Sequence, residues 1–249
     1  MPYSLKGRNV LVTGGSRGLG AVICHKFAAE GCNVIINYVS NAAAAEEVKA
    51  GLDKEFDVKV FIMKADCGVT AECEKLVRDT IDILGGVDII IGNAGWTRFS
   101  TFADLDALSE DEWDKCWATN VKGQMALLRA AMPTFNANPD GGAVIYTSSI
   151  AGVSQGGSSM AYAVTKAAQL QLMKCLAATQ GPKVRVNAVL PGLLLTDWGM
   201  KYSVEAREAL QEKAALKRAV DLGDCADAFI MLAKNTSITG MKVQVDIVN

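Results

Sequence analysis

The sequence contains a single histidine among its 249 residues. A hydrolase with a Ser-His-Asp triad, or a zinc site made of several histidines, would have to depend on this one residue, His25. His25 lies in a predicted helix directly after a glycine-rich turn. We therefore interpret it as a helix-surface residue, and we expect no metal site.

An excess of positive charge is also missing, because 25 Lys and Arg residues face 27 Asp and Glu residues, for a net charge of −2. No basic cluster offers a surface to nucleic acid. No apolar run is long enough to span a bilayer, and residues 1–7 lack the apolar core of a signal peptide. We expect a soluble cytoplasmic protein without nucleic-acid or membrane partners.

The seven cysteines include no CxxC pair and show no metal-ligand spacing. Their scatter through apolar segments indicates reduced core thiols in a reducing compartment, with a reactive thiol as the alternative.

Short segments rich in Val and Ile are what the sequence does contain. Their nearly continuous hydrophobicity is typical of strands buried on both faces, as in a parallel sheet. The predicted strands cover residues 9–13, 33–37, 58–63, 87–92, 143–147, 184–190 and 242–246. The last of them is more polar and suits a sheet edge.

Helical patterns alternate with these strands. They cover residues 19–30, 42–55, 71–84, 110–135, 161–180, 204–213 and 221–233, and Ser109 begins a capping signal. Alternation of this kind predicts βαβ units. The fold class is therefore α/β, a doubly wound (Rossmann) and mostly parallel seven-stranded sheet with helices on both faces. Residues 1–249 form a single domain.

A glycine-rich turn, TGGSRGLG at residues 13–20, joins the first strand to the first helix. Glycines let the backbone approach a pyrophosphate, and the helix N-terminus presents free N–H groups to it. Many loops contain three glycines, but this position in the first βα unit favours dinucleotide binding over a plain turn.

The end of the second strand selects between the two nicotinamide cofactors. NAD would call for an Asp or Glu there, whereas this chain has Asn37, Tyr38, Val39, Ser40 and Asn41. Arg17 can supply positive charge to a 2′-phosphate, and Ser40 and Asn41 can donate hydrogen bonds. NADP(H) is therefore favoured, with a solvated Arg17 and a permissive site as the alternative.

Tyr162 and Lys166 are spaced i, i+4 at the start of a long predicted helix, on one face. We expect the ammonium to lower the pKa of the phenol towards the range useful for proton transfer. Ser148 and Ser149 follow the fifth strand, at the edge where ligands collect. A hydroxyl there could hold a substrate oxygen while Tyr162 transfers a proton.

The motifs together resemble those of the short-chain dehydrogenase/reductase family, from about residue 7 to residue 246. The matching segments are TGGSRGLG (13–20), Asp66, NAG (93–95), Asn120, YTSSIAG (146–152), YAVTK (162–166) and PGLLLT (191–196). One departure lies after Asp246, where relatives commonly have two glycines and this chain has Ile247-Val248-Asn249. It bears on a subunit contact and on the pocket floor.

The resemblance implies a role for each matching residue. Tyr162 is the acid/base, Lys166 its ribose-binding partner, Ser149 the carbonyl-orienting serine, and Asn120 a helix interruption that positions a relay water. Asp66 would accept a hydrogen bond from the adenine amine. The predicted cofactor-binding residues are Gly14, Ser16, Arg17, Gly18, Leu19, Gly20, Asn37, Tyr38, Ser40, Asn41, Asp66, Cys67, Asn93, Ala94, Gly95, Tyr162, Lys166, Pro191, Gly192, Leu194 and Thr196.

The substrate pocket is the least specified part of the prediction. We expect Trp96, Ser149, Met160, Trp198 and Met200 to form an apolar cleft, beneath a lid of about residues 196–215. Each of these large apolar residues could equally pack against the lid helix. The resemblance further implies a homotetramer or dimer formed through the helices that start near residues 110 and 161.

The predicted reaction is NADPH-dependent reduction of a ketone or other carbonyl compound to an alcohol, reversible by the same chemistry. Two alternatives stay open. One is a non-catalytic NADP(H)-binding protein, and the other is a dehydratase, epimerase or cyclase that uses the same pocket.

Overall fold

The structure, a computed structural model, describes residues 3–246. Its seven-stranded sheet has the order β3-β2-β1-β4-β5-β6-β7, and all neighbouring strands are parallel. The strands are β1 (Asn9–Val12), β2 (Asn33–Tyr38), β3 (Val60–Lys64), β4 (Ile89–Gly92), β5 (Gly142–Thr147), β6 (Val184–Pro191) and β7 (Lys242–Val245). The predicted fold class is confirmed, and β7 lies at a sheet edge as expected.

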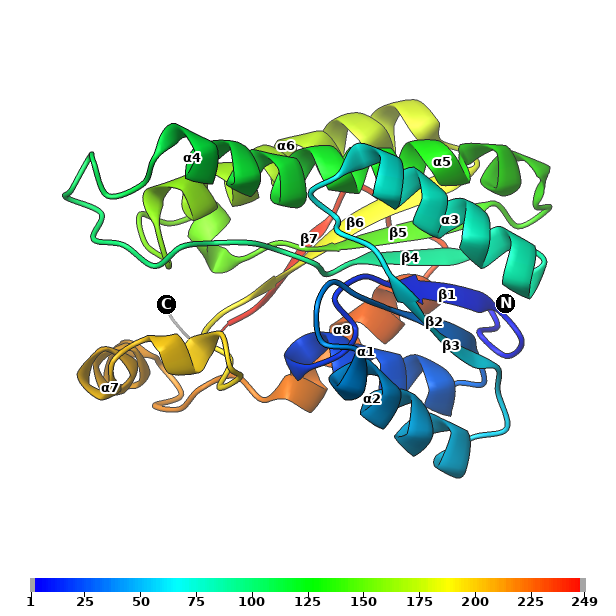
Figure 1. Ribbon diagram of the computed structural model, residues 1–249, viewed down its shortest axis with the longest axis horizontal. Helices are drawn as coiled ribbons and strands as arrows, with labels where there is room; N and C mark the ends of the chain where they lie inside the picture. Colours follow the sequence, from blue (N-terminus) through cyan, green and yellow to red (C-terminus); the bar gives the residue numbers. More distant parts are fainter. Residues whose placement is uncertain (1–2, 247–249) are drawn as a thin grey trace.

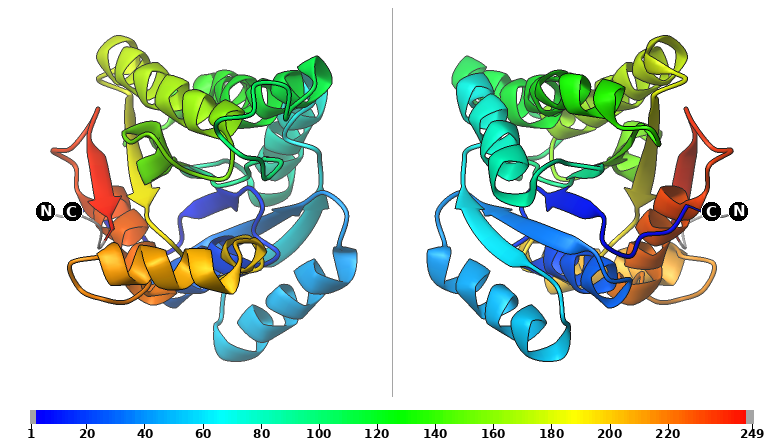
Figure 2. Two further views of the ribbon diagram at one scale, coloured as in Figure 1. Left: turned by 90° about the vertical axis from the view of Figure 1, so that its left-hand side faces the viewer. Right: turned by 90° about the vertical axis from the view of Figure 1, so that its right-hand side faces the viewer.

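Helices cover both faces of this sheet (Figures 1 and 2). On the lower face in Figure 1 lie α1 (Gly18–Ala29), α2 (Ala42–Glu55) and α8 (Leu222–Lys234). On the upper face lie α3 (Thr70–Leu84), α4 (Glu110–Trp117), α5 (Gly123–Ala137) and α6 (Met160–Gln180). The remaining helix, α7 (Val204–Lys213), belongs to the predicted lid.

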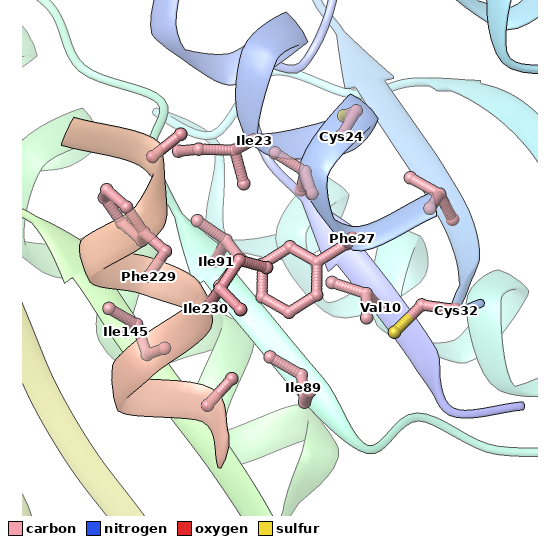
Figure 3. Close-up of a cluster of buried hydrophobic side chains, with 14 of the residues drawn as sticks. Val10, Ile23, Cys24, Phe27, Cys32, Ile89, Ile91, Ile145, Phe229 and Ile230 are labelled. Carbon is pink, nitrogen blue, oxygen red and sulfur yellow. The ribbon is translucent and has the colours of Figure 1, made fainter. Parts of the chain in front are cut away.

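Alternate residues of each central strand enter different hydrophobic cores. Val10 and Val12 of β1 pack in the core beneath α1 and α8, whereas Leu11 packs in the core on the opposite face. Figure 3 shows the first core, where Phe27 and Ile23 of α1 meet Phe229 and Ile230 of α8 over the strands. This burial on both sides explains why the strands lack polar alternation.

The predicted helix over residues 110–135 is divided in the structure. Between α4 and α5 lies one π-helical turn, Ala118–Lys122, with Asn120 at its centre. The interruption expected at Asn120 is therefore present. The predicted capping box is confirmed as well, because the Ser109 hydroxyl accepts from the Glu112 N–H and the Glu112 carboxylate accepts from the Ser109 N–H.

The unusual ending at residues 247–249 lies outside the described residues. Within residues 3–246, no helix combines the length and the apolar character needed to cross a membrane.

Candidate active site

A cleft of about 1120 Å³ opens where the carboxyl ends of the strands meet. Its walls come from the residues that follow β1, β2, β4, β5 and β6, and from the lid segment, which we define as residues 196–215. Ligands of doubly wound sheets bind in this location. The cleft is therefore the candidate active site.

The glycine-rich turn forms one end of the cleft. Gly14 and Gly18 have φ angles of +61° and +52°, which favour glycine. A Cβ atom on Gly20 would lie 2.2 Å from the Gly14 carbonyl oxygen, so only glycine fits this close approach. The N-terminus of α1 has no side-chain cap, which leaves its N–H groups to a ligand such as a phosphate. The turn thus fits a dinucleotide.

Two asparagines hold this turn in place. The Asn37 Oδ1 atom accepts from the Gly14 N–H at 3.1 Å, and the Asn93 Nδ2 atom donates to the Thr13 and Gly14 carbonyl oxygens at 3.0 and 3.2 Å. Asn37 also donates to the Ala65 carbonyl oxygen at 3.0 Å. Its side chain is therefore occupied by contacts within the protein, although the residue lines the cleft.

Polar residues near the end of β2 line the cleft without any carboxylate among residues 37–41. The Asn41 Oδ1 atom caps α2 by accepting from the Ala44 N–H at 3.0 Å. Across the cleft, Arg17 Nη1 lies 3.6 Å from Asp197 Oδ2, and both side chains are largely exposed. Such a pair contributes little to stability, so Arg17 can exchange its partner for a ligand.

Tyr162 and Lys166 occupy the first turns of α6. The Ser159 hydroxyl caps this helix and accepts from the Tyr162 N–H at 3.1 Å, which sets where the tyrosine enters. Lys166 is buried and donates from Nζ to the Thr147 carbonyl oxygen at 2.6 Å. The same Nζ atom lies 5.4 Å from the centre of the Tyr162 ring. The expected juxtaposition of phenol and ammonium is present.

The protonation of this pair differs from the sequence-based expectation. Burial raises the pKa of Tyr162 well above its ordinary value, and a hydrogen bond with Ser149 opposes that rise. Burial also lowers the pKa of Lys166 to about 8. The expected lowering of the Tyr162 pKa by Lys166 is not seen in the protein alone, because desolvation of the phenol outweighs the other effects.

The two serines after β5 have different surroundings. Both line the cleft, but Ser149 lies beside Tyr162 and lowers the pKa of its phenol, whereas the buried Ser148 donates to the Lys166 carbonyl oxygen at 3.2 Å. The geometry therefore favours Ser149 as the group that meets a substrate oxygen, with Ser148 supporting α6.

Asn120 is fully buried behind the cleft. Its Oδ1 atom accepts from the Trp96 N–H at 2.8 Å, and its Nδ2 atom donates to the Trp96 carbonyl oxygen at 3.0 Å and to Thr165 Oγ1 at 2.9 Å. The Asn120 side chain thus links the loop after β4 to α6 through hydrogen bonds. The water-positioning role of Asn120 stays a prediction.

The structure brings every predicted cofactor-binding residue to the cleft. Among the predicted pocket residues, Trp96, Ser149 and Trp198 line it, but Met160 and Met200 do not. Met160 precedes Tyr162 by two positions on α6, and residues two apart on a helix do not share a face. Met200 is 54% exposed and contacts Arg207 of α7 through its sulfur atom.

Several cleft residues were missed by sequence reasoning. They lie in α4 (Lys115), in the loop before α6 (Gln155), in the lid segment (Tyr202 and Lys213), in the loop after it (Arg218) and in β7 (Gln244). No local pattern marks them, because their places depend on how segments far apart in the sequence meet at the cleft.

Comparison with known proteins identifies the family. The model of the short chain dehydrogenase family matches residues 8–207 of this chain. The chain belongs to the short-chain dehydrogenase/reductase family. The protein is therefore an oxidoreductase that acts on CH–OH or C=O groups.

Relatives match over almost the whole chain. The short-chain dehydrogenase/reductase SDRA from Arabidopsis thaliana is 35% identical, covering 96% of this chain and 93% of that protein. The 3-oxoacyl-acyl-carrier-protein reductase FabG from Staphylococcus epidermidis is 31% identical, covering 96% and 97%. The crystal structure of a short chain dehydrogenase from Burkholderia cenocepacia in complex with NADP has a TM-score of 0.91 at 30% identity, covering 99% of each chain.

Proposed function

We propose that this enzyme uses NADPH to reduce a ketone or another carbonyl compound to an alcohol. The observation that carries the proposal is that Ser149, Tyr162 and Lys166 line the same cleft as the glycine-rich turn. One cavity thus holds the proton donor, the hydroxyl that orients the substrate and the turn that binds the dinucleotide. When bound, the nicotinamide supplies the hydride that adds to the carbonyl carbon.

The side chains of this cleft handle the substrate oxygen. Ser149 donates a hydrogen bond to it, and Tyr162, whose raised pKa keeps the phenol protonated, delivers a proton to the oxygen as the alcohol forms. Lys166 stabilises the phenolate that remains when it carries its charge. Alcohol oxidation is the same sequence in reverse.

The choice of NADP(H) over NAD(H) rests on the end of β2 and on Arg17. No carboxylate among residues 37–41 would repel a 2′-phosphate. Arg17 has a side-chain exposure of 70% and only a long contact to Asp197 at 3.6 Å. The Burkholderia relative, whose structure contains NADP, supports the same choice.

We further propose that the enzyme is a cytoplasmic homo-oligomer, a tetramer or a dimer. Met125 of α5 and Val164 of α6 are 39% and 43% exposed on the helices predicted to form the subunit contact. Six of the seven cysteines are buried free thiols, which agrees with a reducing compartment.

The test is NADPH oxidation by the purified protein with a panel of ketones. The Tyr162→Phe variant is expected to lose activity by about 10²-fold or more, because a positioned general acid contributes about 10²–10⁴. NADPH binding, measured by calorimetry, should survive, because only the phenolic hydroxyl is removed. Full turnover by the variant would contradict the assigned role of Tyr162.

The same experiment separates the alternatives. A non-catalytic binding protein would bind NADPH but oxidise none of it on any ketone. A dehydratase, epimerase or cyclase would form product without net consumption of NADPH. Product analysis with and without the cofactor decides between them.

A further inference from the structure

Tyr202 brings a further phenol to the cleft that holds Tyr162 and Tyr38. It lies between the short helical turn Gly199–Lys201 and α7, and its backbone N–H donates to the Gly199 carbonyl oxygen at 3.2 Å. The next residue, Ser203, caps α7 by accepting from the Ala206 N–H at 3.2 Å. The position of Tyr202 is therefore determined by structured backbone on both sides.

The ring of Tyr202 packs edge-on against Phe99, with centroids 4.9 Å apart and an interplanar angle of 77°. Phe99 belongs to the loop after β4, which is held by the Ser100 N–H donating to the Ser158 carbonyl oxygen at 2.9 Å. The aromatic pair thus joins the lid segment to the loop after β4, and it restricts the orientation of the phenol.

The hydroxyl of Tyr202 has no hydrogen-bond partner within residues 3–246. Burial raises the pKa of this phenol, so it stays protonated at neutral pH and can donate. A negative charge on Tyr202 would raise the pKa of Tyr162. The two phenols therefore interact electrostatically within the same cleft.

The walls between these phenols are aromatic. Trp198 of the lid segment lies 5.5 Å from the Tyr162 ring, centroid to centroid, and its edge would lie 4.0 Å from a Cβ on Gly95. Trp96 follows Gly95 directly and also lines the cleft. Two indole side chains thus line the cleft beside the reacting position, and aromatic walls of this kind suit a planar ring.

Resting on the reductase function above, we propose that Tyr202 donates a hydrogen bond to a second oxygen of the substrate. The substrates are then aryl ketones that carry an acceptor oxygen on the ring. The ketone oxygen meets Ser149 and Tyr162, the ring lies between the indoles, and the ring oxygen meets Tyr202. The proposal accounts for a donor that is partly buried and has no hydrogen-bond partner among residues 3–246.

The experiment compares acetophenone with 3′- and 4′-methoxyacetophenone in the wild-type enzyme and in Tyr202→Phe. Binding of each ketone to the enzyme–NADP⁺ complex is measured by calorimetry, because no reaction can occur in that complex. The kcat/KM for NADPH oxidation is measured in parallel. Tyr202→Phe keeps the ring that packs on Phe99 and removes only the hydroxyl.

The wild-type enzyme is expected to prefer at least one methoxy ketone over acetophenone by about five- to tenfold, the usual effect of one hydrogen bond. Tyr202→Phe should lose this preference and bind acetophenone as before. The ratio between enzymes cancels the electronic effect of the methoxy group. An equal preference in both enzymes, or none in the wild type, would overturn the proposal.

The two proposals fail in different ways. If no ketone is reduced but the binding preference depends on Tyr202, the reductase function is wrong and the contact stands. If ketones are reduced and Tyr202→Phe changes nothing, the reductase function stands and the contact is wrong.

Discussion

The Lys166 amine is buried, and within residues 3–246 its one hydrogen bond runs from Nζ to the Thr147 carbonyl oxygen at 2.6 Å. Burial disfavours its charged form, and this lowers its pKa to about 8. The phenol of Tyr162 shifts in the opposite direction, because burial also disfavours a phenolate. Near neutral pH the pair is therefore a protonated phenol beside an ammonium, the form that reduction requires.

This pairing predicts the pH dependence of reduction. Below about pH 8 Lys166 carries its charge and stabilises the phenolate left by proton transfer, and above it the charge is lost. The value of kcat/KM for the ketone should thus be flat at lower pH and fall about tenfold per pH unit above about 8. Lys166→Arg, whose guanidinium stays charged, should be slower but should lack this descending limb. If kcat/KM still fell above about pH 8 in the arginine variant, the fall would have to come from the titration of a group other than Lys166.

For single residues, the sequence predicted that Tyr162 and Lys166 lie close together, but it did not predict the direction in which the pKa of Tyr162 shifts. The i, i+4 spacing was sufficient to place Tyr162 and Lys166 on one face of α6. The sign of the Tyr162 shift depended on how deeply the phenol is buried, which spacing does not encode. Likewise, Met160 and Met200 were predicted as pocket residues from their places in loops that flank the reacting carbon, although their directions depend on the helices that carry them.

At the scale of elements, the turn between β1 and α1 depends strictly on its residue types. Gly20 is the tightest point, since a Cβ there would lie 2.2 Å from the Gly14 carbonyl oxygen and 2.7 Å from Asn93 Nδ2. A methyl group can be accommodated only if the turn backbone moves, and that same backbone forms the phosphate cradle.

Gly20→Ala is therefore expected to destabilise the protein by about 1–3 kcal/mol, as overpacking does. It should also raise the dissociation constant of NADPH by about tenfold or more, since each 1.4 kcal/mol corresponds to a factor of ten. Gly51→Ala is the matched control, because Gly51 lies in exposed α2 with no atom within 4 Å of an added Cβ. The control should gain about 0.5–1 kcal/mol and keep its affinity. Calorimetry and urea unfolding measure both quantities, and an equal effect of the two changes would contradict the argument.

The strength of a sequence signal also varied among the elements. The bounds of α2 and α7 were predicted as observed, because both helices are delimited by caps at Asn41 and Ser203. The predicted helix over residues 110–135 has a continuous helical pattern, yet the structure inserts a π-helical turn at Asn120. The family resemblance was the signal that indicated this interruption at Asn120.

For the whole molecule, the alternation of strands and helices predicted the doubly wound parallel sheet, but it did not predict the roof of the cleft. Residues of the lid segment reach the cleft through single contacts with distant walls, such as Trp198 on Tyr162 and Tyr202 on Phe99. These contacts join positions about 40 and 100 residues apart, and no local pattern specifies them. Sequence reasoning therefore predicted the cofactor half of the cleft better than the substrate half.

Cofactor binding in this cleft should raise the Tm of the whole protein. A ligand that binds only the folded state stabilises it by about 2.7 kcal/mol at a concentration of 100 times its Kd. For a chain of 249 residues this corresponds to a rise in Tm of about 5–10 °C. NADPH should produce this shift, and NADH at the same concentration should produce a smaller one, because only NADPH offers a 2′-phosphate to Arg17.

The Tm shift with NADPH is expected to depend on Arg17. Arg17→Ala removes the cation but leaves the glycine backbone of the turn, so the Tm shift with NADPH should fall to that with NADH. Asp197→Ala should act in the opposite direction, since it removes the carboxylate that lies 3.6 Å from Arg17. Equal shifts from NADPH and NADH in the wild-type protein would mean that the end of β2 does not select the cofactor. The absence of a carboxylate at the end of β2 would then allow NADPH to bind without favouring it over NADH.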